Sequence, residues 1–235
     1  MTLELGGKSP QLVFDDADLE AAVPVVLNAI IQNAGQTCSA GSRVLIQHGV
    51  YETVLQRLAE RFTALQAGPP ALELAMGPLV NRKQYDQVQR FVREAEEARI
   101  PVMARGTLHP EAASSGYYQP AVLFRDVPHD SAIAQREIFG PVLAAMPFDD
   151  EDEAIRLANG TDYGLVAGIW TRDGARQLRV ARKLRCGQVF INNYGAGGGV
   201  ELPFGGVKSS GHGREKGFEA LLGFTVLKTI AIKHG

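Results

Sequence analysis

Amphipathic helical segments alternate with short apolar segments along almost the whole chain, and this alternation limits the fold more than any other feature. Apolar residues recur at helical spacing over residues 16–34, 50–66, 81–98, 151–158, 175–184 and 214–222. Apolar runs of strand length occupy residues 11–14, 42–47, 101–104, 117–124, 141–148, 165–171, 188–192 and 225–232. Strands that alternate with helices form crossover units. The pattern therefore predicts an α/β protein of three layers, in which helices cover both faces of a mostly parallel sheet.

The composition is that of an ordinary globular protein and argues against several other classes. With 235 residues, of which 45% are hydrophobic, the chain has room for one large domain with a substantial core. The formal net charge of −2 argues against a nucleic-acid-binding protein and against a polybasic membrane anchor. The longest apolar stretch, residues 23–31, contains Pro24 and Asn28 and is too short to cross a bilayer.

The two cysteines differ in their surroundings. A pair of cysteines in a chain of this length is no disulfide framework, so we expect a reducing compartment and a soluble cytoplasmic protein. Cys38 lies in NAGQTCSAGS, where small and polar neighbours suit an accessible nucleophile with backbone N–H donors around it. The same position suits a buried small residue equally well, and local context leaves both interpretations open. Cys186 enters the apolar run QVFIN, which favours core packing.

The remaining titratable residues give weaker signals. The five histidines are scattered, without metal-ligand spacing and without a place beside Cys38, so no metal site is predicted. Glu4 stands before a Gly-Gly pair, and its local context favours an exposed carboxylate near the start of the sequence. Glu137 lies in QREIFGPV, where a solvated loop charge before a strand is an equally good explanation. Neither G-x-G-x-x-G nor G-x-x-x-x-G-K-[ST], the phosphate-binding signatures, occurs. The residues alone thus indicate an α/β domain with one candidate reactive cysteine.

Six segments, in order, resemble the aldehyde dehydrogenase superfamily. LELGGKSP at residues 3–10 is similar to the general-base motif of that family, and GQTCSAGSR at residues 35–43 to the motif around its catalytic cysteine. EIFGPV at residues 137–142 resembles its cofactor-contacting loop. NGTDYGLVAGIWTRD, GQVFINN and PFGGVKSSGHGRE follow in the family's order. The resemblance covers essentially all of the chain and corresponds to the catalytic, C-terminal half of such an enzyme.

The resemblance implies an oxidoreductase that converts an aldehyde to a carboxylate with NAD or NADP. Cys38 would attack the aldehyde carbon to give a thiohemiacetal, and hydride transfer to the nicotinamide would leave a thioester. Glu4 would then activate the water that hydrolyses the thioester. Family members that pass the acyl group to coenzyme A lack the equivalent glutamate, so water is the expected acceptor.

Further roles follow from the same resemblance. Glu137 matches the carboxylate that holds the nicotinamide ribose, and Phe139 matches the ring at the nicotinamide end of the cofactor. Gln84 matches a weaker cofactor contact, and Leu5 is expected to touch the nicotinamide. Phe204 resembles a residue that lines the substrate tunnel. The identity of the aldehyde and the choice between NAD and NADP are not predicted.

Family members also carry a cofactor-binding half before the general-base motif, and no segment of this sequence resembles it. We therefore expect a catalytic domain over residues 1–223 and an oligomerisation strand over residues 224–235, in a homo-oligomer that acts on a small aldehyde. The 235 residues on their own are expected to be inactive as a dehydrogenase. Two alternatives are a cofactor-free esterase that uses Cys38 and a non-catalytic chain that acts only through its dimerisation surface.

Overall fold

A seven-stranded sheet with the order β11-β10-β2-β3-β8-β7-β5 forms the centre of the computed structural model, which describes residues 1–112, 116–195 and 199–235. Its strands are β2 (Pro10–Val13), β3 (Arg43–Gln47), β5 (Val102–Arg105), β7 (Val122–Phe124), β8 (Val142–Phe148), β10 (Val166–Trp170) and β11 (Gln188–Ile191). Neighbouring strands are parallel, except that β5 runs antiparallel to β7. The predicted mostly parallel sheet is confirmed.

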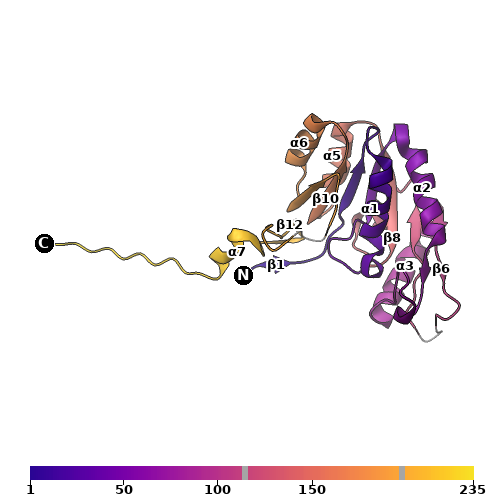
Figure 1. Cartoon of the computed structure of the whole chain (residues 1–235), viewed down its shortest axis with the longest axis horizontal. Helices are drawn as coiled ribbons and strands as arrows, with labels where there is room; N and C mark the ends of the chain where they lie inside the picture. The colour runs from indigo at the N-terminus through magenta and orange to yellow at the C-terminus, as the bar shows by residue number, and fades with distance from the viewer. Residues whose placement is uncertain (113–115, 196–198) are drawn as a thin grey trace.

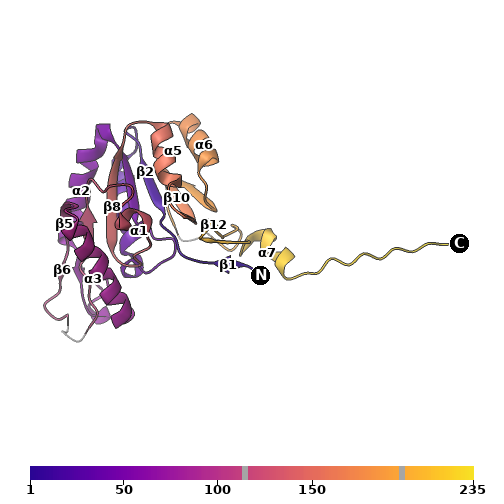
Figure 2. The ribbon, with the colours of Figure 1, turned by 180° about the vertical axis from the view of Figure 1, so that it is seen from behind.

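Helices cover both faces of this sheet (Figures 1 and 2). One face carries α1 (Leu19–Ile31) and α2 (Tyr51–Ala64), and the other carries α3 (Arg82–Glu97), α4 (Ala132–Gln135), α5 (Glu151–Asn159) and α6 (Gly174–Lys183). Successive side chains of a strand point to opposite faces, so Val13 packs into the α1–α2 core while Leu12 and Phe14 pack into the other. The predicted three-layer arrangement is therefore confirmed as well.

Short elements attach the N-terminal segment and the C-terminal loops to this body. The two-stranded sheets pair β1 (Leu3–Glu4) with β13 (Gly211–His212), β9 (Tyr163–Gly164) with β12 (Val207–Lys208), and β4 (Gln66–Ala67) with β6 (Thr107–Leu108). Single turns of 3-10 helix form η1 (Gln32–Gly35), η2 (His48–Val50) and η3 (Pro70–Leu72), and α7 (Gly217–Gly223) ends the ordered elements. The pairing of β1 with β13 brings the first residues of the chain beside the glycine-rich segment that precedes α7.

The first helix is shorter than the sequence pattern predicts. It begins where the Asp18 carboxylate accepts hydrogen bonds from two backbone N–H groups of the first turn, as expected of an N-cap. It ends at Ile31 instead of residue 34, because Asn33, Ala34 and Gly35 take left-handed backbone with φ of 51°, 54° and 75°. The left-handed residues therefore separate α1 from the turn that contains Cys38.

Two other boundaries were predicted too early. The helix expected over residues 214–222 begins at Gly217, because Glu215 instead forms an antiparallel bridge with Phe204. The strand expected over residues 117–124 begins only at Val122, since the preceding residues, which include Pro120, pair with no neighbouring strand in the described chain. In both cases the apolar pattern begins before the hydrogen bonding of the helix or strand does.

The strand predicted over residues 225–232 is wrong for the chain as a single molecule. Residues 225–235 have no regular structure and extend away from the body (Figure 1). Val226 is 93% exposed and Leu227 is fully exposed. A strand needs a partner for its N–H and C=O groups, and no strand within the described residues lies beside this segment.

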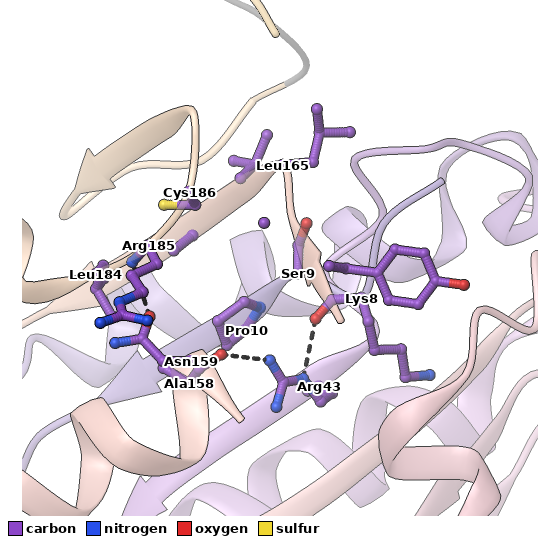
Figure 3. Close-up of a pocket in the computed structure, with 14 residues that line it drawn as sticks. Lys8, Ser9, Pro10, Arg43, Ala158, Asn159, Leu165, Leu184, Arg185 and Cys186 are labelled. Atoms are coloured by element: carbon purple, nitrogen blue, oxygen red, sulfur yellow. Dashed lines mark hydrogen bonds between the residues drawn. The ribbon is translucent and has the colours of Figure 1, made fainter. Parts of the chain in front are cut away.

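A buried arginine joins the sheet to the segment before β2 and to α5. Arg43, the first residue of β3, is 1% exposed. Its guanidinium donates to the carbonyl oxygens of Lys8 at 2.9 Å, Leu157 at 2.9 Å and Ala158 at 2.8 Å, and two of these bonds are visible in Figure 3. Leu157 and Ala158 belong to the last turn of α5, where free carbonyl groups favour a cation.

We expect Arg43→Leu to lower the free energy of unfolding by roughly 3 kcal/mol or more. The substitution leaves three carbonyl groups without their donor, and each buried polar group without a partner costs about 1–3 kcal/mol. Denaturant titration followed by circular dichroism measures the change. Arg57→Leu is the matched control, since Arg57 pairs with Glu20 at an exposed site and its loss should cost at most about 1 kcal/mol. Equal losses in the two variants would contradict the anchoring role of Arg43.

Candidate active site

Glu4 presents a buried carboxylate at the edge of the domain. The β1–β13 pairing places Glu4 opposite Gly211. Both carboxylate oxygens are buried, and neither has a hydrogen-bond partner among the described residues. Burial raises the pKa of Glu4, the nearby Glu215 carboxylate raises it further, and Arg214 acts in the opposite direction. A carboxylate with a raised pKa is a stronger base than an ordinary one and suits proton transfer near neutral pH.

The Gly6–Gly7 pair is the point at which three distant segments meet. The Gly7 N–H donates to Glu137 Oε1 at 2.9 Å, across 130 residues of sequence. A Cβ on Gly6 would lie 2.4 Å from Glu137 Oε2, and a Cβ on Gly7 would lie 2.2 Å from the Cys38 carbonyl oxygen. Only glycine leaves room for these two approaches. The pair therefore brings Cys38 and Glu137 to the segment that carries Glu4.

Cys38 lies in a tight turn between η1 and β3. The Ala40 N–H closes the turn by donating to the Thr37 carbonyl at 3.1 Å. Before the turn, Gly35 has a φ of 75°, and a Cβ there would lie 2.3 Å from carbonyl atoms of Gly140. Backbone conformation and close approach both require glycine at this position. The turn that holds the thiol is thus pressed against the loop that follows Glu137.

The electrostatic environment of Cys38 keeps its proton on the sulfur. The residue is half-buried, and burial is the largest cause of its raised pKa. The carboxylates of Glu4 and Glu137 raise the pKa further, while the N–H of Ser39 lowers it. Cys38 therefore differs from cysteines that are activated by a neighbouring cation. A thiol of this kind becomes a nucleophile when a nearby base removes its proton, and Glu4 lies within electrostatic range.

The loop after Glu137 is held in an unusual backbone conformation. Phe139 has a φ of 58°, which is strained for a residue with a bulky side chain and is a feature that concentrates at functional sites. The Gln84 Nε2 supports the loop by donating to the carbonyls of Ile138 at 3.0 Å and Phe139 at 2.7 Å. Burial raises the pKa of Glu137, whereas the Gly7 N–H and Lys8 lower it.

Leu5 and Phe204 lie near Glu4, Leu5 as the next residue of the chain and Phe204 through its neighbour Gly205. Leu5 is 48% exposed, and its N–H donates to the Ser210 carbonyl at 3.1 Å. Phe204 is half-buried, and the Lys216 Nζ stands 5.5 Å from the centre of its ring. A Cβ on Gly205, the next residue, would lie 3.0 Å from Glu4 Oε1. The residues singled out from the sequence thus belong to one connected region of the molecule.

Two charged residues of this region were missed by the sequence analysis. Lys8 is 1% exposed, and its Nζ has no hydrogen-bond partner among the described residues. Burial lowers the pKa of Lys8 to about 7, Arg43 lowers it as well, and Glu137 raises it. Glu215 raises the pKa of Glu4. Lys8 lies in LELGGKSP and Glu215 in PFGGVKSSGHGRE, and a charge close to glycines in each segment was the available signal.

The described residues contain no group of three or more His, Cys, Asp or Glu side chains placed to bind a metal. None of the helices in the described ranges has the length and apolar character needed to span a bilayer.

The sequence profile described as "Aldehyde dehydrogenase family" matches residues 1–230. The chain belongs to the aldehyde dehydrogenase family. It is 44% identical to a betaine aldehyde dehydrogenase of Cereibacter sphaeroides, covering 100% of this chain and 48% of that protein. It is 42% identical to an aldehyde dehydrogenase of Emericella nidulans, covering 100% of this chain and 47% of that protein. The chain therefore spans about half the length of these curated aldehyde dehydrogenases.

Solved structures of aldehyde dehydrogenases show the same fold. A protein from Burkholderia cenocepacia assigned to these enzymes is 67% identical and superposes with a TM-score of 0.97 over 100% of this chain and 49% of its own. The betaine aldehyde dehydrogenase of Staphylococcus aureus, solved in complex with NAD+, is 34% identical with a TM-score of 0.91, over 96% of this chain and 45% of its own.

The two thiols of this aldehyde dehydrogenase chain are expected to react at different rates. Burial raises the pKa of Cys186 to about 11, and its Sγ donates to the Gln188 carbonyl at 3.2 Å. Figure 3 shows Cys186 in the lining of a pocket to which Lys8 and Arg43 also contribute. Iodoacetamide should therefore label Cys38 several times faster than Cys186, as measured by peptide mapping over time. Cys38→Ser is the control for peak assignment, and faster labelling of Cys186 in the native chain would refute the assignment.

Proposed function

We propose that Cys38 and Glu4 carry out the oxidation of an aldehyde to a carboxylate as nucleophile and general base. The observation that carries this proposal is the meeting of the Glu4, Cys38 and Glu137 segments at Gly6 and Gly7. The Cys38 sulfur attacks the carbonyl carbon, an S–C bond forms as the electrons of the C=O π bond move to the oxygen, and the thiol proton leaves to a nearby base. After oxidation of that carbon, Glu4 removes a proton from water, the water oxygen bonds to the acyl carbon, and the S–C bond breaks.

We infer that the Glu137 loop receives the nicotinamide end of NAD or NADP. The cofactor, when bound, supplies the acceptor for the hydride of the substrate carbon. The Gly7 N–H fixes one Glu137 oxygen, so the carboxylate has a defined direction toward a ribose hydroxyl. Leu5 lies two residues before Gly7 and Phe139 lies two residues after Glu137, and both side chains offer apolar surface for a ring. Gln84 acts here by supporting the loop through two carbonyls, a more indirect role than the cofactor contact expected from the sequence.

The proposed oxidation is that of the whole protein. The relatives that define the family are about twice as long as this chain. Because no segment of the 235 residues resembles a dinucleotide-binding turn, we expect these residues alone to show no dehydrogenase activity. Both cysteines are free, and a free nucleophilic thiol suits a reducing compartment such as the cytoplasm. The substrate is a small aldehyde, and the acyl acceptor is water.

The nucleophile and the base can be tested without the cofactor, because an activated ester acylates a catalytic thiol directly. With p-nitrophenyl acetate, we expect mass spectrometry to detect an acetyl group on Cys38 and none in Cys38→Ala. Glu4→Gln should still acylate but lose the acetyl group about 100-fold more slowly, since a positioned base contributes about 100- to 10,000-fold. Glu60→Gln, on the exposed side of α2, is the control. Equal deacylation in Glu4→Gln and Glu60→Gln would disprove the role of Glu4.

We further propose that the chain assembles into a homo-oligomer through its last residues. Apolar side chains are exposed on α7 and along the tail after it, namely Phe218, Leu221, Leu222, Phe224, Val226, Leu227, Ile230 and Ile232. Monomeric proteins rarely expose apolar patches larger than a few hundred Å², and eight large apolar side chains exposed within 15 residues make such a patch the expected result. An extended apolar segment without a partner can add to a sheet edge of a second copy. This makes residues 224–235 the proposed oligomerisation strand.

Deleting residues 224–235 should shift the oligomer toward monomer or cause aggregation, as measured by sedimentation velocity. A control variant that replaces only the final residues 233–235 should sediment as the full chain does, because it leaves the apolar segment intact. A full-length chain that sediments as a monomer at high micromolar concentration would contradict the proposal.

A further inference from the structure

Tyr194 lies in the loop that follows β11 and is fixed there by its neighbours. Two residues earlier, the Asn192 side chain bonds both the N–H and the carbonyl of Thr171, at 3.1 Å and 3.0 Å. The Tyr194 ring packs against Phe190 with 5.8 Å between ring centres. A Cβ on Gly168 of β10 would lie 3.1 Å from the same ring, so the glycine makes room for it. The position of the phenol is thus set by β10 and β11.

The phenol of Tyr194 reaches the turn that holds the nucleophile. Its hydroxyl donates to the Ser39 carbonyl at 2.6 Å, across 155 residues of sequence. Ser39 is 5% exposed, so its carbonyl needs a partner within the protein. Burial raises the pKa of Tyr194, so the hydroxyl keeps its proton and remains a donor at neutral pH.

The two carbonyls around the Ser39 Cα are each held by a distant segment. The Cys38 carbonyl rests against Gly7, where there is no space for a Cβ, and the Ser39 carbonyl accepts a hydrogen bond from Tyr194. The Cys38 carbonyl shares its peptide plane with the Ser39 N–H, which favours the thiolate of Cys38. The Ser39 carbonyl belongs to the next peptide plane. The two contacts therefore restrain the planes on both sides of Ser39, and with them the direction of its N–H.

We propose that Tyr194 is a positioning residue that holds the Cys38 turn in the conformation in which backbone N–H groups stabilise the thiolate. The inference rests on the proposed function, since it takes Cys38 as the reactive group. Tyr194 acts through the Ser39 carbonyl and is not itself a catalytic residue. Its removal loosens the turn at Ser39, the Ser39 N–H loses its alignment with the sulfur, and the thiolate becomes less favourable.

The test is the pH dependence of Cys38 alkylation in the full chain, measured by iodoacetamide labelling and peptide mapping between pH 6 and 11. Tyr194→Phe removes only the hydroxyl. We expect the midpoint of the Cys38 profile to move to higher pH, and the labelling rate below the midpoint to fall by up to about fivefold, the limit reached if the whole of one lost hydrogen bond of about 1 kcal/mol is expressed in the ionisation of the thiol. The profile of Cys186 should not move. An unchanged or lowered midpoint for Cys38 overturns the proposal.

Tyr51→Phe is the matched control, because Tyr51 is a buried tyrosine whose hydroxyl bonds a different group, the Asp126 carboxylate, at 3.0 Å. It should lower the melting temperature without moving the Cys38 midpoint. A midpoint shift of equal size in Tyr51→Phe would show a general effect of destabilisation and overturn the proposal. If Tyr194→Phe does not fold, the same measurement on Phe190→Leu tests the proposal. This variant keeps the Tyr194 hydroxyl but removes the ring that packs against Tyr194. It should raise the Cys38 midpoint by a smaller amount, and no rise overturns the proposal.

The outcome for Tyr194 is distinguishable from failure of the proposed function. If Cys38 in the unmodified chain reacts no faster than Cys186 and is not acylated by p-nitrophenyl acetate, the proposed function fails. The Cys38 midpoint is still measurable by mapping in that case, and its shift in Tyr194→Phe still decides whether the phenol holds the turn.

Discussion

Two cations are buried beneath the candidate site, and the placement of the segment that carries Glu4 depends on how the protein accommodates them. Burial lowers the pKa of Arg43 to about 9 and that of Lys8 to about 7. Arg43 obtains substitutes for water from three carbonyl groups, and because a guanidinium presents its donors in a fixed plane, those carbonyls must keep their positions. One of them belongs to Lys8, the residue after Gly7. Arg43, at the start of the central strand β3, therefore fixes the chain directly after the Gly6–Gly7 pair.

The acidic groups of the site all hold their protons more tightly than usual. Burial is the first cause of the raised pKa in Glu4, Cys38 and Glu137, and the mutual proximity of these groups adds to it for the thiol. Lys8 shifts in the opposite sense. Glu4 and Lys8 thereby move toward neutral pH, whereas the Cys38 thiol moves further above it. The higher pKa of Glu4 makes it a stronger base, which suits the removal of a proton from water or from a thiol.

The alternation of apolar patterns was enough to predict the three layers, the parallel sheet and most element positions, because burial on both faces of a sheet leaves a strong periodic signal. It failed where hydrogen bonding overrode periodicity, as in the left-handed turn at Asn33 and Ala34 and in the bridge between Phe204 and Glu215. Cys38 and Glu4 were found through motif resemblance, whereas local context left both ambiguous. Tyr194 gave no local signal, since its partner Ser39 lies 155 residues away.

The sheet order also determines when the site comes into existence during synthesis. β2 lies between β10 and β3, and β3 lies between β2 and β8. The segment with Glu4 and the turn with Cys38 are made before the strands that flank them, which end at Phe148 and Trp170. Contacts of such long sequence separation form late, because loop closure must precede them. The nascent chain therefore carries Cys38 on an unfinished sheet until Trp170 has been made and β10 can join β2.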